Sequence, residues 1–356
     1  MPDSFTLIAN SKCWIEDDSL SQLKKFSSSP GIVHTVGLPD LHPGKTPIGA
    51  VFASTGIVYP FLVGNDVGCG MALFGTRTNL KKFRPERAAG AYRGLSSLKE
   101  LPFESPYAEP SPIKELGTIG GGNHFAEFQA VEKIFLKDEF KSLDLDRDKV
   151  LLLVHSGSRD LGQRIYEEFL SVEGISLEDP RAGKYLESHA EAVLWAGRNR
   201  RAVASKVTGF LGSELEYRPP MDSAHNFVEE RDGVLLHRKG AVSALQGPVV
   251  IPGSRGTLSF IVKPTPDTRA SLFSLSHGAG RKWPRHLCKG RLEGKYRRSD
   301  LSVTALKSRV ICHDKALLYE EAPEAYKDVS QVVAALTDAG LCQVVCSLRP
   351  LLTLKI

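Results

Sequence analysis

Apolar and polar positions along this chain follow two different periods, which predicts a mixture of helices and strands. Residues 183–211 place apolar side chains such as Tyr185 and Val203 at helical spacing, so a long helix with one exposed face is expected there. Residues 329–338 follow the same period, and Gly340 is expected to end that helix.

Short apolar runs bounded by small residues predict the strands. Residues 48–53 and 64–70 are expected to be strands separated by glycines, and residues 150–154 a buried strand that ends at a Ser/Gly turn. Residues 342–355 predict two further short strands, whereas the proline-rich residues 102–115 are expected to form a loop. Because strands and helices do not alternate strictly, the predicted fold class is α+β and not a doubly wound sheet.

Composition places the chain among ordinary globular proteins. Of its 356 residues, 42% are hydrophobic and 24% are charged. No apolar run approaches the roughly 20 residues of a membrane-spanning helix. The first residues include early acidic side chains and no apolar signal core, so a cytoplasmic protein is expected. Six cysteines without CxxC spacing predict reduced thiols or metal ligands, not a disulfide framework.

Positive charge is concentrated in one segment. Residues 281–298 contain eight basic side chains and a single acidic one, Glu293, so this segment carries +7 of a net charge of only +5. Such a run is typical of a solvated loop and also of a phosphate-binding surface. Its position directly after Ser-His-Gly-Ala-Gly favours the phosphate-binding surface.

His277 is the histidine most closely flanked by small residues, within Ser276-His277-Gly278-Ala279-Gly280. Glycines leave room for a bulky phosphate to approach and for backbone N–H groups to reach it. This motif alone is weak evidence. It becomes informative because other segments offer metal ligands and glycine-rich backbone.

A set of widely separated side chains could hold metal ions. They are Asp66, Cys69, His124, His155 and His225. Each alone is explained as a turn aspartate, a small buried cysteine or a core histidine. Together they form a mixed soft and hard ligand set, which suits zinc, manganese or iron and not an all-oxygen calcium site. Ligands on separate turns are typical of an open catalytic site, including sites with two metals about 3.5–4 Å apart.

Glycine-rich and hydroxyl-rich turns add candidate phosphate-binding groups. The run Gly120-Gly121-Gly122 could form a backbone nest for phosphate before Asn123 and His124. If residues 124–130 form a strand, His124 and Glu127 point to opposite faces, and joint action requires a bulge or a strand end. Residues 252–256 and Ser259 offer hydroxyl and backbone donors, although ordinary turn chemistry explains them nearly as well.

Taken in order, these segments resemble the RtcB family of GTP-dependent RNA ligases. The matching blocks are Pro-Asp-Leu-His at 39–42, Val-Gly-Asn-Asp-Val-Gly-Cys-Gly at 63–70, Gly-Asn-His-Phe at 122–125, His-Ser-Gly-Ser-Arg at 155–159, His-Asn at 225–226, Arg-Lys-Gly-Ala at 238–241, Pro-Gly-Ser at 252–254, Ser-His-Gly-Ala-Gly-Arg at 276–281 and Glu-Ala-Pro-Glu-Ala-Tyr-Lys at 321–327. The resemblance implies one large domain over residues 1–356, with central sheets flanked by helices around a dinuclear metal cleft. The chain is most similar to the shorter branch associated with release factor H.

The resemblance also implies roles for single residues. His277 would attack the α-phosphorus of GTP and become guanylylated, and Asp40 matches a carboxylate needed late in the reaction. Two manganese ions would be held by Asp66, Cys69, His124, His155 and His225, with Cys69 between them. Guanylate would be bound by Asn123, Glu127, Ser254, Ser259, Gly278, Ala279, Gly280, Tyr326 and Lys355. The family usually has a glycine after that lysine, whereas this chain has Ile356.

The implied function is joining an RNA 2′,3′-cyclic phosphate or 3′-phosphate end to a 5′-hydroxyl end. A metal-dependent phosphodiesterase or phosphatase that only trims RNA ends is the alternative, since it needs the metals but not the guanylylated histidine. A non-catalytic RNA-binding module is disfavoured by the intact set of ligands. The implied partners are RNA and GTP, with no membrane and with a functional link to a peptide-release factor; the need for an activating protein stays open.

Overall fold

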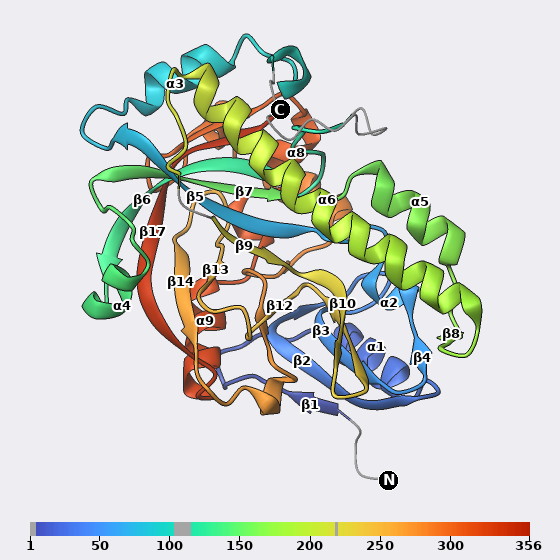
Figure 1. Cartoon of the computed structure of the whole chain (residues 1–356). Coiled ribbons are helices and arrows are strands. Elements are labelled where there is room, and N and C mark those ends of the chain that lie inside the picture. The colour runs from blue at the N-terminus through green and yellow to red at the C-terminus, as the bar shows by residue number, and fades with distance from the viewer. Residues whose placement is uncertain (1–4, 103–114, 218–219) are drawn as a thin grey trace.

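The computed structural model describes residues 5–102, 115–217 and 220–356 and combines long strands with peripheral helices (Figure 1). One sheet has the order β13 (Val249–Ile251), β14 (Ser259–Pro264), β17 (Cys342–Lys355), β6 (Phe125–Ile134), β7 (Lys149–Ser156), β5 (Gly70–Asn79) and β9 (Met221–Ala224), with β16 (Arg309–Cys312) paired to β17. A second sheet has the order β1 (Phe5–Leu7), β2 (Ile32–His42), β3 (Ile48–Ser54), β11 (Val234–Lys239) and β10 (Asn226–Arg231). Two short pairs, β12 (Ala241–Ser243) with β15 (Ser274–Ser276) and β4 (Ile57–Val58) with β8 (Ile175–Ser176), complete the strands.

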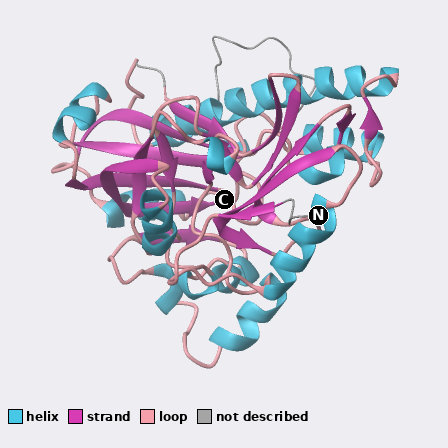
Figure 2. Ribbon diagram, turned by 90° about the horizontal axis from the view of Figure 1, so that it is seen from below, coloured by secondary structure: helices cyan, strands magenta, loops and turns pink. Residues whose placement is uncertain are grey.

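Helices lie around the outside of these strands, as Figure 2 shows. They are α1 (Asp17–Ser27), α2 (Pro60–Val63), α3 (Pro85–Tyr92), α4 (Lys137–Ser142), α5 (Asp160–Phe169), α6 (Pro180–Phe210), α7 (Arg285–Leu292), α8 (Lys315–Glu320) and α9 (Val329–Asp338). The strands are mainly antiparallel and the helices do not alternate with them, so the predicted α+β class is confirmed. In the part of the chain that is described, no helix is both long and apolar enough to cross a membrane.

The long helix predicted at residues 183–211 is confirmed as α6. It begins at Asp179, whose side chain accepts a hydrogen bond from the backbone of Arg181, and Pro180 occupies the first turn. Its apolar face packs on β5 and β7 in the cluster that contains Val203 and Val207, and Figure 1 shows it running across this sheet. The second predicted helix is confirmed as α9, and Gly340 follows its end.

Two strand predictions are wrong. Residues 64–69 form a turn instead of a strand, because Gly64 and Gly68 adopt left-handed φ angles of 83° and 71° that a strand excludes. Residues 342–355 form one continuous strand, β17, where two were expected. Its pairing with β6 shifts register near Ser347 and near Pro350, so the polar–apolar alternation changes phase there and resembles a break in the sequence.

The other local predictions have mixed outcomes. Residues 48–53 and 150–154 are strands, within β3 and β7, as expected. The loop expected at 102–115 lies almost entirely outside the described residues. The strands matter for function because the ends of β5, β6, β7 and β9 come together where the turn after β15 approaches β2.

Candidate active site

A cavity of about 270 Å³ lies between the two sheets and collects most of the predicted residues. Those on its wall are Asp66, Cys69, Asn123, Glu127, His155, His225, Ser254, His277, Gly278, Ala279, Gly280, Tyr326 and Lys355. The other three predicted residues, Asp40, His124 and Ser259, lie directly behind this wall, each in contact with a residue of the site. The structure therefore brings together residues that are separated by up to about 300 positions in the chain.

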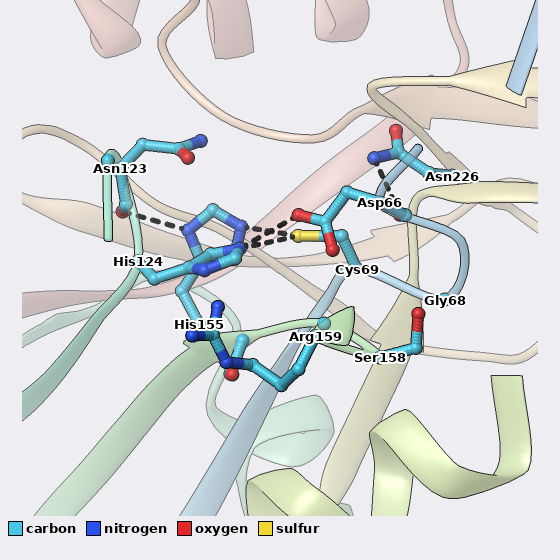
Figure 3. Close-up of polar contacts among 12 residues, drawn as sticks. Asp66, Gly68, Cys69, Asn123, His124, His155, Ser158, Arg159 and Asn226 are labelled. Atoms are coloured by element: carbon cyan, nitrogen blue, oxygen red, sulfur yellow. Dashed lines mark hydrogen bonds and ion pairs between the residues drawn. The ribbon is translucent and has the colours of Figure 1, made fainter. Parts of the chain in front are cut away.

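Three ligand-type atoms cluster at the ends of neighbouring strands. Cys69 immediately precedes β5, His124 immediately precedes β6, and His155 is the penultimate residue of β7. The Cys69 Sγ atom lies 3.2 Å from His124 Nε2 and 3.1 Å from His155 Nε2 (Figure 3). The three ligand atoms lie within 4.8 Å of one another, close enough to hold one metal ion.

Asp66 and His225 extend this cluster on two sides. The Asp66 Oδ2 atom lies 3.0 Å from His124 Nε2, and Figure 3 shows this carboxylate beside the sulfur of Cys69. His225 directly follows β9, which pairs with β5, and its ring centroid lies 5.1 Å from that of His155. Its ring is also 4.9 Å from that of His277. His225 therefore lies between the metal-ligand cluster and His277.

The hydrogen bonding of this cluster fits a cation. His155 Nδ1 donates to the carbonyl oxygen of Asn123 at 3.1 Å, which leaves the lone pair of Nε2 directed at Cys69. Two imidazole nitrogens therefore face one sulfur, whose thiol has only one proton to share. His124 Nδ1 and His225 Nδ1 are buried without a hydrogen-bond partner among the described residues. A positive ion beside Cys69 would accept electron pairs from the sulfur and from the two ring nitrogens that face it.

Burial favours the neutral forms that a metal requires of histidine. It lowers the pKa of His155 and of His225 well below the usual range, so both rings are neutral at pH 7. Burial also raises the pKa of the Cys69 thiol, a direction that a bound metal ion would reverse. Burial alone would raise the pKa of Asp66, but the neighbouring His124 lowers it below the usual value, so this carboxylate is ionised.

Replacing Cys69 by serine is expected to remove most of the bound metal, because a neutral hydroxyl is a much weaker ligand for a divalent cation than an anionic thiolate. The measurement is metal content per chain after loading with divalent metal and dialysis against metal-free buffer. Cys346→Ser replaces an equally buried thiol on β17, outside this cavity, and should leave the metal content unchanged. Equal metal content in wild type and Cys69→Ser would refute the ligand set.

His277, in the turn after β15, is oriented by a buried carboxylate on β2. Asp40 lies on β2, and its Oδ2 accepts hydrogen bonds from His277 Nδ1 at 2.6 Å and from the His277 backbone N–H at 3.2 Å. Because Nδ1 carries the proton toward Asp40, Nε2 of this cavity-lining ring keeps its lone pair, and it has no hydrogen-bond partner in the part of the chain that is described. The approach of these segments requires Gly280, since a Cβ there would lie 2.4 Å from the Asp40 carbonyl oxygen.

Two of the guanylate-binding candidates, Glu127 and Lys355, lie near the start of β6 and at the end of β17. Glu127 is buried, and burial raises its pKa to about 7 while Gln129 donates a hydrogen bond to it at 2.7 Å. Lys355 donates from Nζ to the carbonyl oxygens of Gly122 and His124, at 2.8 and 2.7 Å. His124 lies just before β6 and Glu127 near its start, so both side chains reach the site from one strand end. A strand end was one of the two arrangements that the sequence left open for joint action of these residues.

Two arginines of the basic segment contribute to this cavity instead of the outer surface. Arg281 and Arg285 both donate from Nη1 to Oε1 of Glu321, at 3.1 and 2.8 Å, and all three side chains line the cavity. Glu321 is buried, and although burial raises its pKa, nearby cations, Lys355 first, bring the net pKa below the usual value. The result is a cationic wall suited to phosphate oxygens.

Three residues of the site were not singled out from the sequence. Glu321 had appeared only as the first residue of the 321–327 block. Lys239 is partly buried, lines the cavity and donates from Nζ to the Val63 carbonyl at 2.7 Å. His42 stacks on His277 with ring centroids 6.3 Å apart, and burial lowers its pKa to about 3. All three lie within the blocks that match the family, and this match was the sequence signal that could have identified them.

Comparisons with known proteins agree with this geometry. The family model described as tRNA-splicing ligase RtcB matches residues 22–98 and 93–356. The chain is 43% identical to RNA-splicing ligase RtcB2 of Escherichia coli, over 100% of this chain and 96% of that protein. It is 30% identical to tRNA-splicing ligase RtcB of Archaeoglobus fulgidus, over 95% of this chain and 91% of that protein. The matched residues span both sheets and every segment of the cavity, and the chain therefore belongs to the RtcB family.

Proposed function

We propose that this protein is a GTP- and manganese-dependent RNA ligase, which joins an RNA 2′,3′-cyclic phosphate or 3′-phosphate end to a 5′-hydroxyl end during RNA repair or splicing. The observation that carries the proposal is the position of His277. Its Nε2 has no hydrogen-bond partner among the described residues, its Nδ1 is held by Asp40, and its ring lies 4.9 Å from that of His225 beside the ligand cluster. Membership of the RtcB family and the printed names of the relatives support the same activity.

Five side chains would hold two manganese ions. The ligands are Asp66, Cys69, His124, His155 and His225. When bound, the ions would neutralise charge on non-bridging phosphate oxygens. Cys69 Sγ lies 3.2 Å from His124 Nε2 and 3.1 Å from His155 Nε2, so these three side chains would contribute ligands to the same ion.

His277 would carry the guanylyl group. The Nε2 lone pair forms a bond to the α-phosphorus of GTP, and the bond from that phosphorus to the pyrophosphate oxygen breaks. The imidazolium that results is stabilised by the carboxylate of Asp40 at 2.6 Å. The guanylate would be bound by Asn123, Glu127, Ser254, Ser259, Tyr326 and Lys355, with the backbone of Gly278, Ala279 and Gly280 against the phosphate.

The RNA steps follow the same order of bond changes. Water opens a 2′,3′-cyclic phosphate to a 3′-phosphate, an oxygen of which takes GMP from His277 as the N–P bond breaks. The 5′-hydroxyl oxygen then attacks the activated phosphorus and GMP leaves. Asp40 was expected to act in this last attack. Asp40 is completely buried and accepts two hydrogen bonds from His277. These contacts favour instead a role in orienting the His277 ring and stabilising its positive charge after attack.

The trimming alternative is less well supported. A phosphodiesterase needs metal ions but no nucleophilic histidine, and it would give no reason for the buried carboxylate behind His277.

We also propose that the protein works in the cytoplasm and is functionally linked to a peptide-release factor. All six cysteines are free thiols, which is typical of a reducing compartment.

A ligation assay tests the proposal directly. Two labelled RNA fragments, one ending in a 2′,3′-cyclic phosphate and one beginning with a 5′-hydroxyl, are incubated with the protein, GTP and manganese. A joined product is expected with GTP and not with ATP, and none from fragments with 3′-hydroxyl and 5′-phosphate ends. Conversion of the cyclic phosphate to 3′-phosphate without any joined product would replace the ligase proposal by the trimming enzyme.

A further inference from the structure

A second cavity, of about 670 Å³, lies beside the active-site cavity and contains an exposed tryptophan. Pro39 and Lys282 line this cavity, whereas their neighbours Asp40 and Arg281 serve the first one. Adjacent residues of an extended chain point to opposite sides. The two cavities are therefore separated by little more than the backbone of these segments, and Tyr326 lines both.

Trp14 forms part of this wall from the loop between β1 and α1. Half of its surface is exposed, at 50%, although indole rings usually bury most of their area. The loop is firmly held. Asn10 donates from Nδ2 to Asp338 at the end of α9 at 2.7 Å, and Glu16 pairs with the ammonium group of Lys327 at 3.0 Å. The exposed ring is thus presented by an anchored loop.

Three lysines lie around the ring or on its wall; Lys327, 5.9 Å from the ring centroid, is paired with Glu16, whereas Lys12 and Lys282 have no ion-pair partner among the described residues. The ammonium group of Lys282 lies 5.9 Å from the ring centroid of Trp14 and 5.9 Å from that of Trp283. Lys12 is exposed on the same wall. Within the described ranges, neither lysine has a carboxylate within 4.0 Å. Asp328 also lines the cavity, but its Oδ1 accepts hydrogen bonds from the backbone and hydroxyl of Ser330.

We propose that Trp14 stacks against a base of single-stranded RNA, in the arm that leads to one of the two reacting ends, while Lys12 and Lys282 bind its phosphates. This inference rests on the proposed function. An aromatic face combined with unpaired cations is the arrangement that binds single-stranded nucleic acid without reading its sequence. The base that stacks on Trp14 would belong to a neighbour of the reacting nucleotide, because the reacting phosphate would lie in the active-site cavity.

Equilibrium binding of labelled RNA to the full chain tests this inference. The probes are ten-nucleotide single-stranded RNAs that carry either a 5′-hydroxyl or a 3′-phosphate at the end to be joined. Trp14→Ala is expected to weaken binding of one of the two about tenfold, within the range of one lost base–aromatic stack. Trp14→Phe keeps an aromatic ring and should bind within about threefold of wild type. Tyr217→Ala removes a fully exposed ring elsewhere and should bind as wild type does.

Two results would overturn the inference. The first is unchanged RNA binding by Trp14→Ala, and the second is an equal loss in Trp14→Ala and Trp14→Phe, since a ring that stacks is retained only in the latter. Thermal unfolding of both variants checks that each is folded. Transfer of labelled GMP from GTP to His277 needs no RNA, so it should be normal in Trp14→Ala; failure of this transfer in the wild type would count against the proposed function instead.

Photochemical cross-linking locates the base. RNAs with 5-iodouridine at single positions in either arm are irradiated with the wild-type protein, and the attached peptide is identified by mass spectrometry. A cross-link to Trp14 is expected from one position in one arm, and this position gives the distance from the reacting end in nucleotides. Cross-links confined to peptides outside this cavity, from every position of both arms, would refute the assignment.

Discussion

Replacing His277 by alanine is expected to abolish transfer of GMP from α-labelled GTP to the protein. No other imidazole in the described cavity has one nitrogen held by a buried carboxylate and the other without a hydrogen-bond partner. The expected loss exceeds about 10³-fold, the scale seen when a nucleophile of this kind is removed. The label on wild-type protein should be labile to acid and stable to alkali, as expected for a phosphoramidate.

A second readout separates the nucleophile from the rest of the site. In the proposed mechanism, opening of the 2′,3′-cyclic phosphate would use water and the metal-ligand cluster and not His277, so His277→Ala is expected to retain this activity while joining no RNA. His286→Ala, which changes an exposed histidine in the basic segment, should be labelled like the wild type. Persistent label on His277→Ala would assign the nucleophile to another residue, and absence of label on the wild type would favour the trimming enzyme.

Replacing Asp40 by asparagine is expected to slow guanylylation of His277 by about 10²–10⁴-fold, with the fold retained. Asparagine keeps the shape but loses the charge that stabilises the imidazolium, and it no longer enforces a proton on Nδ1. Comparable losses follow when the carboxylate behind a catalytic histidine is neutralised. The measurement is the single-turnover rate of labelling, together with thermal unfolding of the variant.

The same variant decides between two roles for Asp40. If this carboxylate orients His277, both guanylylation and the overall joining of RNA should slow. If it acts in the final attack instead, Asp40→Asn should be guanylylated at the wild-type rate, and RNA whose 3′-phosphate already carries GMP should accumulate. The second pattern would contradict the role that the hydrogen bonds indicate.

Much of the fold was readable from local patterns. The period of apolar residues located α6 and α9, and the buried run at 150–154 located the centre of β7. The same reasoning failed where backbone geometry overrides the pattern. The turn between Gly64 and Gly68 depends on φ angles, and the bulges that keep β17 continuous depend on its partner β6.

The sequence alone determined which chemical groups are present and in what order. It identified His277 among small residues, the mixed ligand set, and blocks in RtcB order. Only the tertiary structure decided which groups touch. It placed Asp40 against His277 across 237 positions, brought Glu321 to Arg281 and Arg285, and set Trp14 beside Lys282. The physical reason is range: periodicity and residue chemistry act over a few neighbours, whereas these contacts depend on strand register and on how two sheets meet.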